Sequence, residues 1–380
     1  MATKGANQRI SLHLQLSTES GRDLLEKPIQ APAKPLPAQD LELILKAVGS
    51  DWEQLRNQKI FITGGTGFFG CWLLESFITA NRALNLNAKA TVLTRDPVAF
   101  AGKAPHIASD SSIQLIAGDV RTFNFPTGDF PFILHAATEA SAALAKERPL
   151  EMLTTIVDGT RRVLEFAEAS KARKFLLTSS GAVYGVQPSE ITHVPESYLG
   201  GPNPVDPASV YGEGKRISEQ MCVLHAAHCN FECKIARCFA FVGPHLPLNA
   251  HFAIGNFLGD IMQGKKIHIG GDGTPMRSYL YAADLAIWLW KMLFVAPAGQ
   301  AYNVGSDEDL SILDLAQTMV ATLGQATAID VAKVPVPGAP ILRYVPAITK
   351  AQKELGLHPS VGLKEAIRRT AEWHGFPVTK

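Results

Sequence analysis

The sequence predicts an α/β protein with a doubly wound parallel sheet and a smaller C-terminal lobe. Through the first 240 residues, short apolar runs alternate with segments of helical periodicity, as expected of parallel strands joined by crossover helices. A glycine-rich turn at residues 64–70 separates the first apolar run from the first helix. Beyond Phe241 the alternation loosens and prolines and glycines increase, so we expect the smaller lobe to begin there.

An N-terminal arm followed by alternating strands and helices is expected along the chain. Clustered prolines from Pro28 to Pro37 predict that residues 1–38 form a poorly ordered or surface-draped arm. Residues 40–56 carry apolar side chains at helical spacing, which predicts an amphipathic helix, either a structural appendage or a docking site for a partner. Strands are expected at 59–63, 90–93, 113–117, 132–137, 174–178 and 234–237. Helices are expected at 71–80 and 149–170, and in the smaller lobe near 255–264, 282–294, 311–323 and 362–374.

The composition is that of an ordinary globular protein. Of 380 residues, 46% are hydrophobic, and the net charge of +1 provides no field that would attract nucleic acid or an anionic membrane. The most apolar run, 285–296, is interrupted by Lys291 and is too short to span a bilayer, and the polar N-terminus lacks a secretory segment. Five cysteines in apolar surroundings favour reduced thiols and a cytoplasmic location. The Cys and His residues at 222–233 match no zinc-ligand spacing, so no metal is expected.

The glycine turn has the context of a dinucleotide-binding loop. A strand precedes it and a helix follows, and Gly64, Gly67 and Gly70 let the backbone approach a pyrophosphate at the helix N-terminus. A tight turn without a ligand is the alternative. At the end of the second strand, an acid would accept from the ribose of NAD, but the sequence has Thr94 and then Arg95, which favours NADP. A surface arginine without such a role is the other interpretation.

Tyr211 and Lys215 lie four residues apart, on one face of an expected helix. A free phenol, with a pKa of about 10, is a poor base at neutral pH, and a nearby ammonium group favours the phenolate. Ser180, at the end of an expected strand, can hold a substrate oxygen. Together with the upstream glycine loop, these three residues predict proton transfer coupled to hydride transfer with a nicotinamide.

Further motifs accompany these residues, and together they resemble the extended short-chain dehydrogenase/reductase family, specifically its nucleotide-sugar epimerase/dehydratase branch. The resemblance spans about residues 58–375. It is carried by the stretches Thr63-Gly64-Gly65-Thr66-Gly67-Phe68-Phe69-Gly70, Gly118-Asp119-Val120, His135-Ala136-Ala137, Ser179-Ser180-Gly181-Ala182-Val183-Tyr184-Gly185, Tyr211 with Lys215, Arg237 with Gly243-Pro244, and Arg277-Ser278-Tyr279-Leu280-Tyr281-Ala282-Ala283-Asp284.

The resemblance implies a Rossmann-like NAD(P)-binding domain at 57–240, preceded by the arm and helix at 1–56 and followed by a mainly substrate-binding lobe at 241–380. It implies a nucleotide-diphosphate sugar as substrate, a homodimer, and catalytic roles for Ser180, Tyr211 and Lys215. Contacts to NAD or NADP are expected from Gly64, Thr66, Gly67, Phe68, Phe69, Gly70, Thr94, Arg95, Asp119, Val120, Ala136, Ala137, Tyr211 and Lys215. Substrate contacts are expected from Thr138, Ser180, Asn256 and Arg277, whose guanidinium fork suits a diphosphate unless it only forms a surface salt bridge.

The chain departs from the family pattern at five positions. Members that remove water across C5 and C6 of the sugar carry an Asp-Glu pair after the catalytic hydroxyl, where this chain has Gly181 and Ala182. Classical 4,6-dehydration is therefore disfavoured. An Asn expected before the Gly-Thr pair of a helix is Ile156, an Asn expected after Arg237 is Ala240, and Gly214 replaces a common serine.

Two reactions at C4 of the sugar fit these residues best. The branch resemblance favours an epimerase, in which the hydride leaves and returns to the other face. Arg95 and the missing acid pair fit an NADPH-dependent 4-keto-sugar reductase. A 4,6-dehydratase or a decarboxylase ranks lower, as does reduction of a small carbonyl compound that carries no nucleotide. A non-catalytic NAD(P)-binding sensor ranks last, because both Tyr211 and Lys215 are present.

Overall fold

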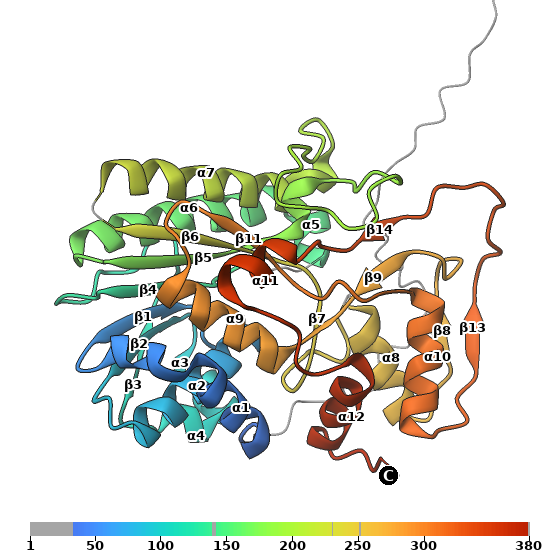
Figure 1. Cartoon of the computed structure of the whole chain (residues 1–380), viewed down its shortest axis with the longest axis horizontal. Coiled ribbons are helices and arrows are strands. Elements are labelled where there is room, and N and C mark those ends of the chain that lie inside the picture. The colour runs from blue at the N-terminus through green and yellow to red at the C-terminus, as the bar shows by residue number, and fades with distance from the viewer. Residues whose placement is uncertain (1–32, 139–141, 230, 251, 379–380) are drawn as a thin grey trace, which may run out of the picture.

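The predicted parallel sheet forms the centre of the molecule. The computed structural model describes residues 33–138, 142–229, 231–250 and 252–378 (Figure 1). Seven strands lie in the order β11-β6-β5-β4-β1-β2-β3, and all six neighbouring pairs are parallel. Their bounds are β1 Lys59–Thr63, β2 Lys89–Thr94, β3 Ile113–Ala117, β4 Phe132–His135, β5 Lys174–Ser180, β6 Glu232–Cys238 and β11 Ala301–Val304. The six strands expected from sequence are confirmed, while the seventh, β11, was not expected.

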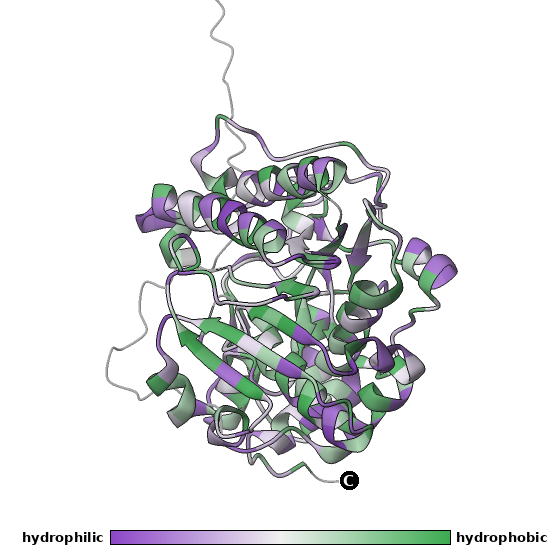
Figure 2. Ribbon diagram, turned by 90° about the vertical axis from the view of Figure 1, so that its left-hand side faces the viewer, coloured by the Kyte–Doolittle hydropathy of each residue, from purple (hydrophilic) through white to green (hydrophobic). Residues whose placement is uncertain are grey.

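Helices cover both faces of the sheet, which explains why its strands are apolar on both sides. On β1, Phe61 belongs to the hydrophobic cluster on the face covered by α6 (Pro149–Ala169) and α7 (Val210–His228). Ile60 and Ile62 belong to the cluster on the other face, which α2 (Phe68–Ala83) and α9 (Ala282–Val295) cover. Figure 1 shows α6 and α7 on one side of the sheet and α2 and α9 on the other. In Figure 2 most of the strand residues are coloured as hydrophobic.

Short helices and connections complete this part of the chain. α3 (Pro97–Lys103) and α4 (Pro105–Ala108) lie between β2 and β3, and α5 (Ala142–Glu147) precedes α6. In the described part of the chain, no helix has the length and apolarity that a membrane crossing requires.

The helix expected at 40–56 is present in two pieces. α1 (Ala38–Val48) ends at Gly49, whose positive φ of 61° breaks the helix, and a 3-10 helix, η1 (Gly49–Leu55), follows. The single continuous helix of the prediction was therefore wrong, but its packing on the main domain is confirmed by the buried Asp40. This carboxylate accepts hydrogen bonds from Tyr281 Oη (2.6 Å) and Arg369 Nη1 (2.5 Å). Residues 1–32, most of the expected arm, lie outside the described residues.

The C-terminal third combines helices with very short strands. The four expected helices are confirmed as α8 (Ala253–Met262), α9, α10 (Ile312–Leu323) and α12 (Leu363–Trp373), and α11 (Thr349–Leu355) is additional. The strands are β7 (Phe241–Val242) with β10 (Leu280–Tyr281), β9 (Met276–Ser278) between β12 (Asp309–Ser311) and β14 (Arg343–Tyr344), and β8 (Ile267–Ile269) with β13 (Ile329–Val331). Because β11 returns to the central sheet, residues 241–380 do not fold wholly apart from it. The domain boundaries stay a prediction.

Candidate active site

Two glycines of the nucleotide loop are required by the fold itself. Gly64 has a φ of +72°, and a Cβ there would lie 2.4 Å from the carbonyl oxygen of Ala136. A Cβ on Gly70 would lie 2.2 Å from the backbone of Gly65. The loop therefore closes tightly against the end of β4 and against the first turn of α2.

Gly67 is different, because the protein alone has room for a side chain at this position. It is the N-cap residue of α2, with an ordinary extended backbone (φ −85°, ψ −170°), and its Cβ would meet nothing closer than the Gly64 oxygen at 3.5 Å. Glycine here leaves the first-turn N–H groups without a side-chain cap. A bare helix N-terminus beside a tight glycine turn fits a pyrophosphate. Phe68 and Phe69 begin the helix, and Thr66 O accepts from Lys103 Nζ at 2.9 Å.

The end of β2 and the segment after β3 bring opposite charges together. Arg95 is exposed directly after the buried Thr94, and Asp96 caps α3 by accepting from Ala99 N at 2.9 Å. Asp119 accepts from Arg121 Nε (2.8 Å) and Nη2 (2.7 Å). The hydrogen bonds from Arg121, and the more distant charge of Arg95, hold the pKa of Asp119 below its usual value.

The remaining expected cofactor residues line the ends of neighbouring strands. Ala136 N donates to Thr63 O (3.1 Å) and Ala137 N to Thr63 Oγ1 (3.1 Å), which fixes the chain beyond β4 beside the glycine loop. Val120 packs on Gly159 of α6, where a Cβ would lie 2.8 Å from Val120 Cγ1. These contacts place the expected residues on the loops at the carboxyl edge of the sheet, where open α/β sheets bind ligands.

Ser180, Tyr211 and Lys215 are brought together at the same edge. Ser180 ends β5, and Tyr211 and Lys215 lie on the first turns of α7. Lys215 Nζ donates to Thr138 Oγ1 (2.6 Å) and to Thr178 O (2.7 Å), and burial lowers its pKa to about 8. Burial raises the pKa of Tyr211 above its usual value, while a hydrogen bond with Ser180 opposes this rise.

A buried ionic network supports the end of β5. Glu219 of α7 accepts from Ser179 Oγ (2.5 Å) and from Arg237 Nη2 (2.7 Å). Arg237 Nη1 also donates to Tyr184 Oη (2.9 Å), and Tyr184 Oη donates to Asn303 Oδ1 (2.7 Å). The motif residue Arg237 therefore links α7, β6 and β11 around Ser180.

A second polar chain runs between the cofactor loop and α7. His135 Nδ1 lies 2.7 Å from Thr63 Oγ1, and His135 Nε2 lies 3.2 Å from Thr160 Oγ1, which in turn contacts Ser218 Oγ at 3.0 Å. Burial lowers the pKa of His135 to about 3, so the imidazole is neutral at physiological pH. Ser218 Oγ donates to Gly214 O (3.0 Å), one residue before Lys215.

Sequence reasoning missed Tyr344. Its hydroxyl lies 3.4 Å from Ser180 Oγ, and its ring centroid lies 4.7 Å from that of Phe239. Tyr344 is paired with Arg277 across β14 and β9, and the Arg277 guanidinium lies 5.9 Å from the Tyr344 ring. The sequence gives no signal for this contact, because Tyr344 follows a Pro- and Gly-containing loop and is separated from Ser180 by 164 positions.

The expected substrate residues Thr138, Asn256 and Arg277 lie on three different segments of the fold. Thr138, beyond β4, contacts Lys215, and Arg277 lies beside Tyr344. Asn256 belongs to α8, and its buried Oδ1 has no hydrogen-bond partner among the described residues. Such a carbonyl oxygen is costly to leave unpaired and suits a ligand that donates to it.

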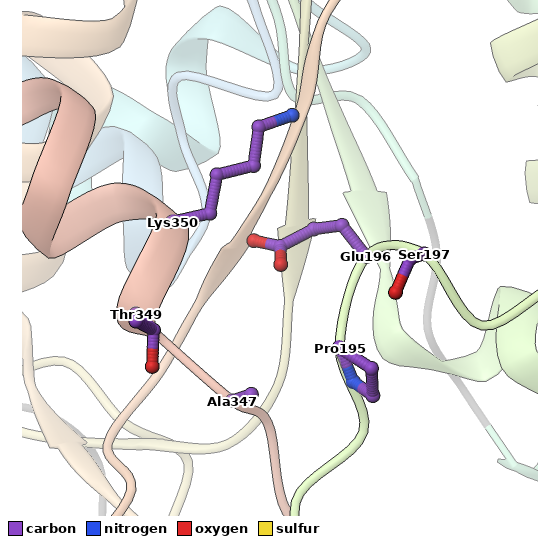
Figure 3. A pocket seen from close by; sticks show the side chains of 6 residues that line it. All are labelled: Pro195, Glu196, Ser197, Ala347, Thr349 and Lys350. Atoms are coloured by element: carbon purple, nitrogen blue, oxygen red, sulfur yellow. The ribbon is translucent and has the colours of Figure 1, made fainter.

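A surface hollow of about 510 Å³, which none of these residues line, lies at the outer edge of β11 (Figure 3). Glu196 Oε1 accepts from Asn303 N (2.8 Å), and Lys350 Nζ donates to Ala301 O (3.0 Å). These side chains satisfy polar groups on the edge strand, which protects it from pairing with another chain. We therefore explain the polar side chains that line the hollow by their hydrogen bonds to the edge strand.

The fold and the glycine loop define a nicotinamide-nucleotide-dependent α/β enzyme of the short-chain dehydrogenase/reductase type. Residues 60–305 match the family model described as NAD dependent epimerase/dehydratase family. The chain belongs to this family, which confirms the expected enzyme class and nicotinamide cofactor.

Proteins named for different reactions are similar to this chain in sequence or in fold. UDP-glucuronic acid decarboxylase 5 of Arabidopsis thaliana is 30% identical over 315 residues, 82% of this chain and 87% of the relative. The UDP-glucuronic acid 4-epimerase of Bacillus cereus, solved with UDP-glucuronic acid and NAD, is 23% identical with a TM-score of 0.71 and covers 84% of this chain and 99% of that one. DesIV, the dTDP-glucose 4,6-dehydratase of Streptomyces venezuelae, is 22% identical with a TM-score of 0.70. The match covers 84% of this chain and 97% of that one.

Proposed function

We propose that the chain interconverts C4 epimers of a nucleoside-diphosphate sugar. The observation that carries the proposal is the cluster at the carboxyl edge of the sheet. The Ser180 and Tyr211 hydroxyls are hydrogen-bonded there, and the buried Lys215 ammonium lies one helical turn from Tyr211. Family membership supports a nucleotide-sugar substrate.

Each residue of the cluster has a proposed role in proton transfer. Tyr211 takes the proton of the C4 hydroxyl and later returns one to the 4-keto oxygen, while Ser180 holds that oxygen. In the protein alone, burial favours the neutral phenol, so Tyr211 needs positive charge nearby to act as a base. Lys215 supplies such charge below about pH 8. Bound NAD supplies the hydride acceptor and donor for C4.

We propose NAD as the cofactor, although Arg95 in the sequence favoured NADP. The bare N-terminus at Gly67 is suited to the pyrophosphate, and Ala136 and Ala137 lie beside Gly64 of the same loop. The charge of Arg95 is partly balanced, because it lies near enough to Asp119 to lower the pKa of that carboxyl. Arg95 therefore gives no strong preference for a 2′-phosphate, and the family description supports NAD.

Asn256, Arg277 and Thr138 are the proposed substrate contacts. The unpaired Asn256 oxygen suits an N–H donor of a nucleotide base, and Arg277 suits a diphosphate. UDP-glucuronic acid is the first substrate to test, since curated relatives and a solved neighbour are named for it. The homodimer stays a prediction.

A decarboxylase is the second candidate because of the curated relatives. Oxidation at C4 of a glucuronic acid places a ketone β to the carboxylate. Loss of CO₂ then leaves an enolate whose C5 must take a proton. Gly181 and Ala182, beside Ser180, supply no such proton, and a Cβ on Gly181 would lie 2.7 Å from the Phe239 ring. An acid at 181 would not fit without moving Phe239, which favours epimerisation over decarboxylation.

The test is to denature the purified protein and identify any nucleotide that it releases. Stoichiometric NAD that survives dialysis is expected, because an epimerase returns the hydride within one cycle. The protein is then incubated with UDP-glucuronic acid, and the products are followed by NMR. A protein that releases no nucleotide and binds NADPH far better than NADH would refute the epimerase proposal and favour the keto-sugar reductase. A pentose product would establish the decarboxylase.

A further inference from the structure

Three potential metal ligands meet where α6 and α7 end. Glu168 lies in the last turn of α6, His225 lies in the last turn of α7, and Cys229 is the C-cap of α7. The carboxylate oxygen, imidazole nitrogen and thiol sulfur all lie within 4.8 Å of one another. His225 and Cys229 are four residues apart, which places both side chains on one face at the helix end. This cluster lies at the opposite end of α7 from Tyr211.

The surroundings of the cluster favour a cation. Two helices end there, and the carbonyl groups of a helix C-terminus carry partial negative charge. Glu168 forms no ion pair with a Lys or Arg among the described residues, so its charge is not balanced by a neighbour within contact distance. Burial, followed by the charge of Glu168 and a hydrogen bond to it, raises the pKa of the Cys229 thiol.

We propose that Glu168, His225 and Cys229 form a binding site for a zinc-class divalent cation, with water as the fourth ligand. One oxygen, one nitrogen and one sulfur ligand suit a borderline-soft ion such as Zn²⁺ and not Mg²⁺ or Ca²⁺. In a tetrahedral zinc site with bonds of about 2.0–2.3 Å, ligand atoms lie roughly 3.3–3.8 Å apart. Glu168 is exposed and the other two residues are half-buried, so small side-chain rotations close the site and the ion can enter from solvent.

The sequence prediction that no metal binds in this region considered only the Cys and His residues at 222–233. The structure separates them, since Cys222 and Cys233 are buried in the core, and it adds Glu168 from a helix about 60 positions earlier. Binding releases the Cys229 proton, so the affinity rises with pH. The site is 14 residues from Lys215, about 21 Å along α7, so the ion ties α6 to α7 without entering the proposed chemistry.

The test uses the full-length, tag-free protein, freed of metal by chelator dialysis and titrated with Co²⁺, which reports thiolate ligation by a near-ultraviolet charge-transfer band. Expected are one Co²⁺ per chain and displacement of the band by Zn²⁺. Cys229→Ser should abolish the band, and His225→Ala should weaken binding about tenfold or more, since even outer-shell partners of metal ligands contribute about 10- to 100-fold. His228→Ala, an exposed histidine on the same helix outside the cluster, is the matched control and should bind as the wild type does.

Two results would overturn the proposal. One is a wild-type protein that shows no thiolate band. The other is a band that persists in Cys229→Ser, because the thiolate would then come from another cysteine. Circular dichroism of each variant verifies that a lost band is not the result of unfolding. A rise in the thermal midpoint on Zn²⁺ addition, seen in the wild type and His228→Ala but not in Cys229→Ser, gives independent support.

Discussion

Replacing Gly67 by alanine tests whether this glycine is required for folding or for cofactor binding. Gly362 provides a matched control, because it too is a helix N-cap with an extended backbone (φ −68°, ψ 157°). A Cβ on Gly362 meets nothing within 4 Å, and one on Gly67 meets only an oxygen at 3.5 Å. Both substitutions therefore fit the folded protein without strain. Only Gly67 lies in the proposed pyrophosphate cradle.

The expected magnitudes differ for stability and for binding. A glycine-to-alanine change at a compatible backbone stabilises by about 0.4–1 kcal/mol, and the loss of glycine at an N-cap costs a similar amount. We therefore expect both variants to unfold within about 1 kcal/mol of the wild type. The methyl group at position 67 would hold a phosphate away from the helix N-terminus. Losing one charge-assisted hydrogen bond costs about 1.5–3 kcal/mol, or roughly a 10- to 150-fold weaker binding of NAD.

Urea unfolding measures the stability of each variant, and calorimetric titration with NAD and NADH measures affinity in cofactor-stripped protein. The expected pattern is normal stability in both variants and weak cofactor binding in Gly67→Ala alone. If Gly67→Ala bound NAD as tightly as Gly362→Ala did, Gly67 would not face the pyrophosphate, and the proposed position of the cofactor would be wrong.

Three further changes test other parts of the account. Tyr211→Phe should lower turnover by about 10²–10⁴ while the cofactor stays bound, because proton transfer is lost, and near-normal rates would exclude Tyr211 as the acid–base group. His135 has a pKa of about 3, so between about pH 6.5 and 3 the unfolded chain binds a proton that the folded chain does not. As the pH is lowered through this window, the free energy of unfolding decreases by about 1.4 kcal/mol per pH unit from this group. His135→Asn should flatten the pH dependence of urea unfolding over that window, and an unchanged slope would argue against a neutral buried imidazole. Arg369→Leu should lower the free energy of unfolding by about 3–5 kcal/mol, because buried Asp40 loses its cationic partner, and a loss below about 1 kcal/mol would contradict the importance of this pair.

The larger elements could be predicted from the sequence because their signals are local. Buried parallel strands such as β5 are continuous apolar runs, and α6 has a clear helical period over 21 residues. The break after α1 was missed because Gly49 was treated as part of a periodic segment. Strands such as β9 and β14 have two or three residues, too few for any period, and form only where distant segments meet.

The candidate site was predicted where residues close in sequence become close in space. Tyr211 and Lys215 share one helix, and Gly64 to Gly70 form one turn, so spacing alone indicated their arrangement. Tyr344 was missed because its position beside Ser180 depends on how a C-terminal strand pairs with β9. The choice of reaction is harder to predict, because epimerisation, decarboxylation and dehydration all begin with oxidation at C4. Only groups around C5, such as those at positions 181 and 182, distinguish these reactions.

An isotope label on C4 of the substrate tests the proposed C4 epimerisation most directly. UDP-glucuronic acid and UDP-glucose, each with deuterium on C4, are incubated with the protein without added nicotinamide, and the products are examined by NMR. A C4 epimer that still carries deuterium on C4 is expected, because the same hydride is removed and returned within one bound cofactor. Release of the label, turnover only with added NADPH, or formation of a pentose would contradict it.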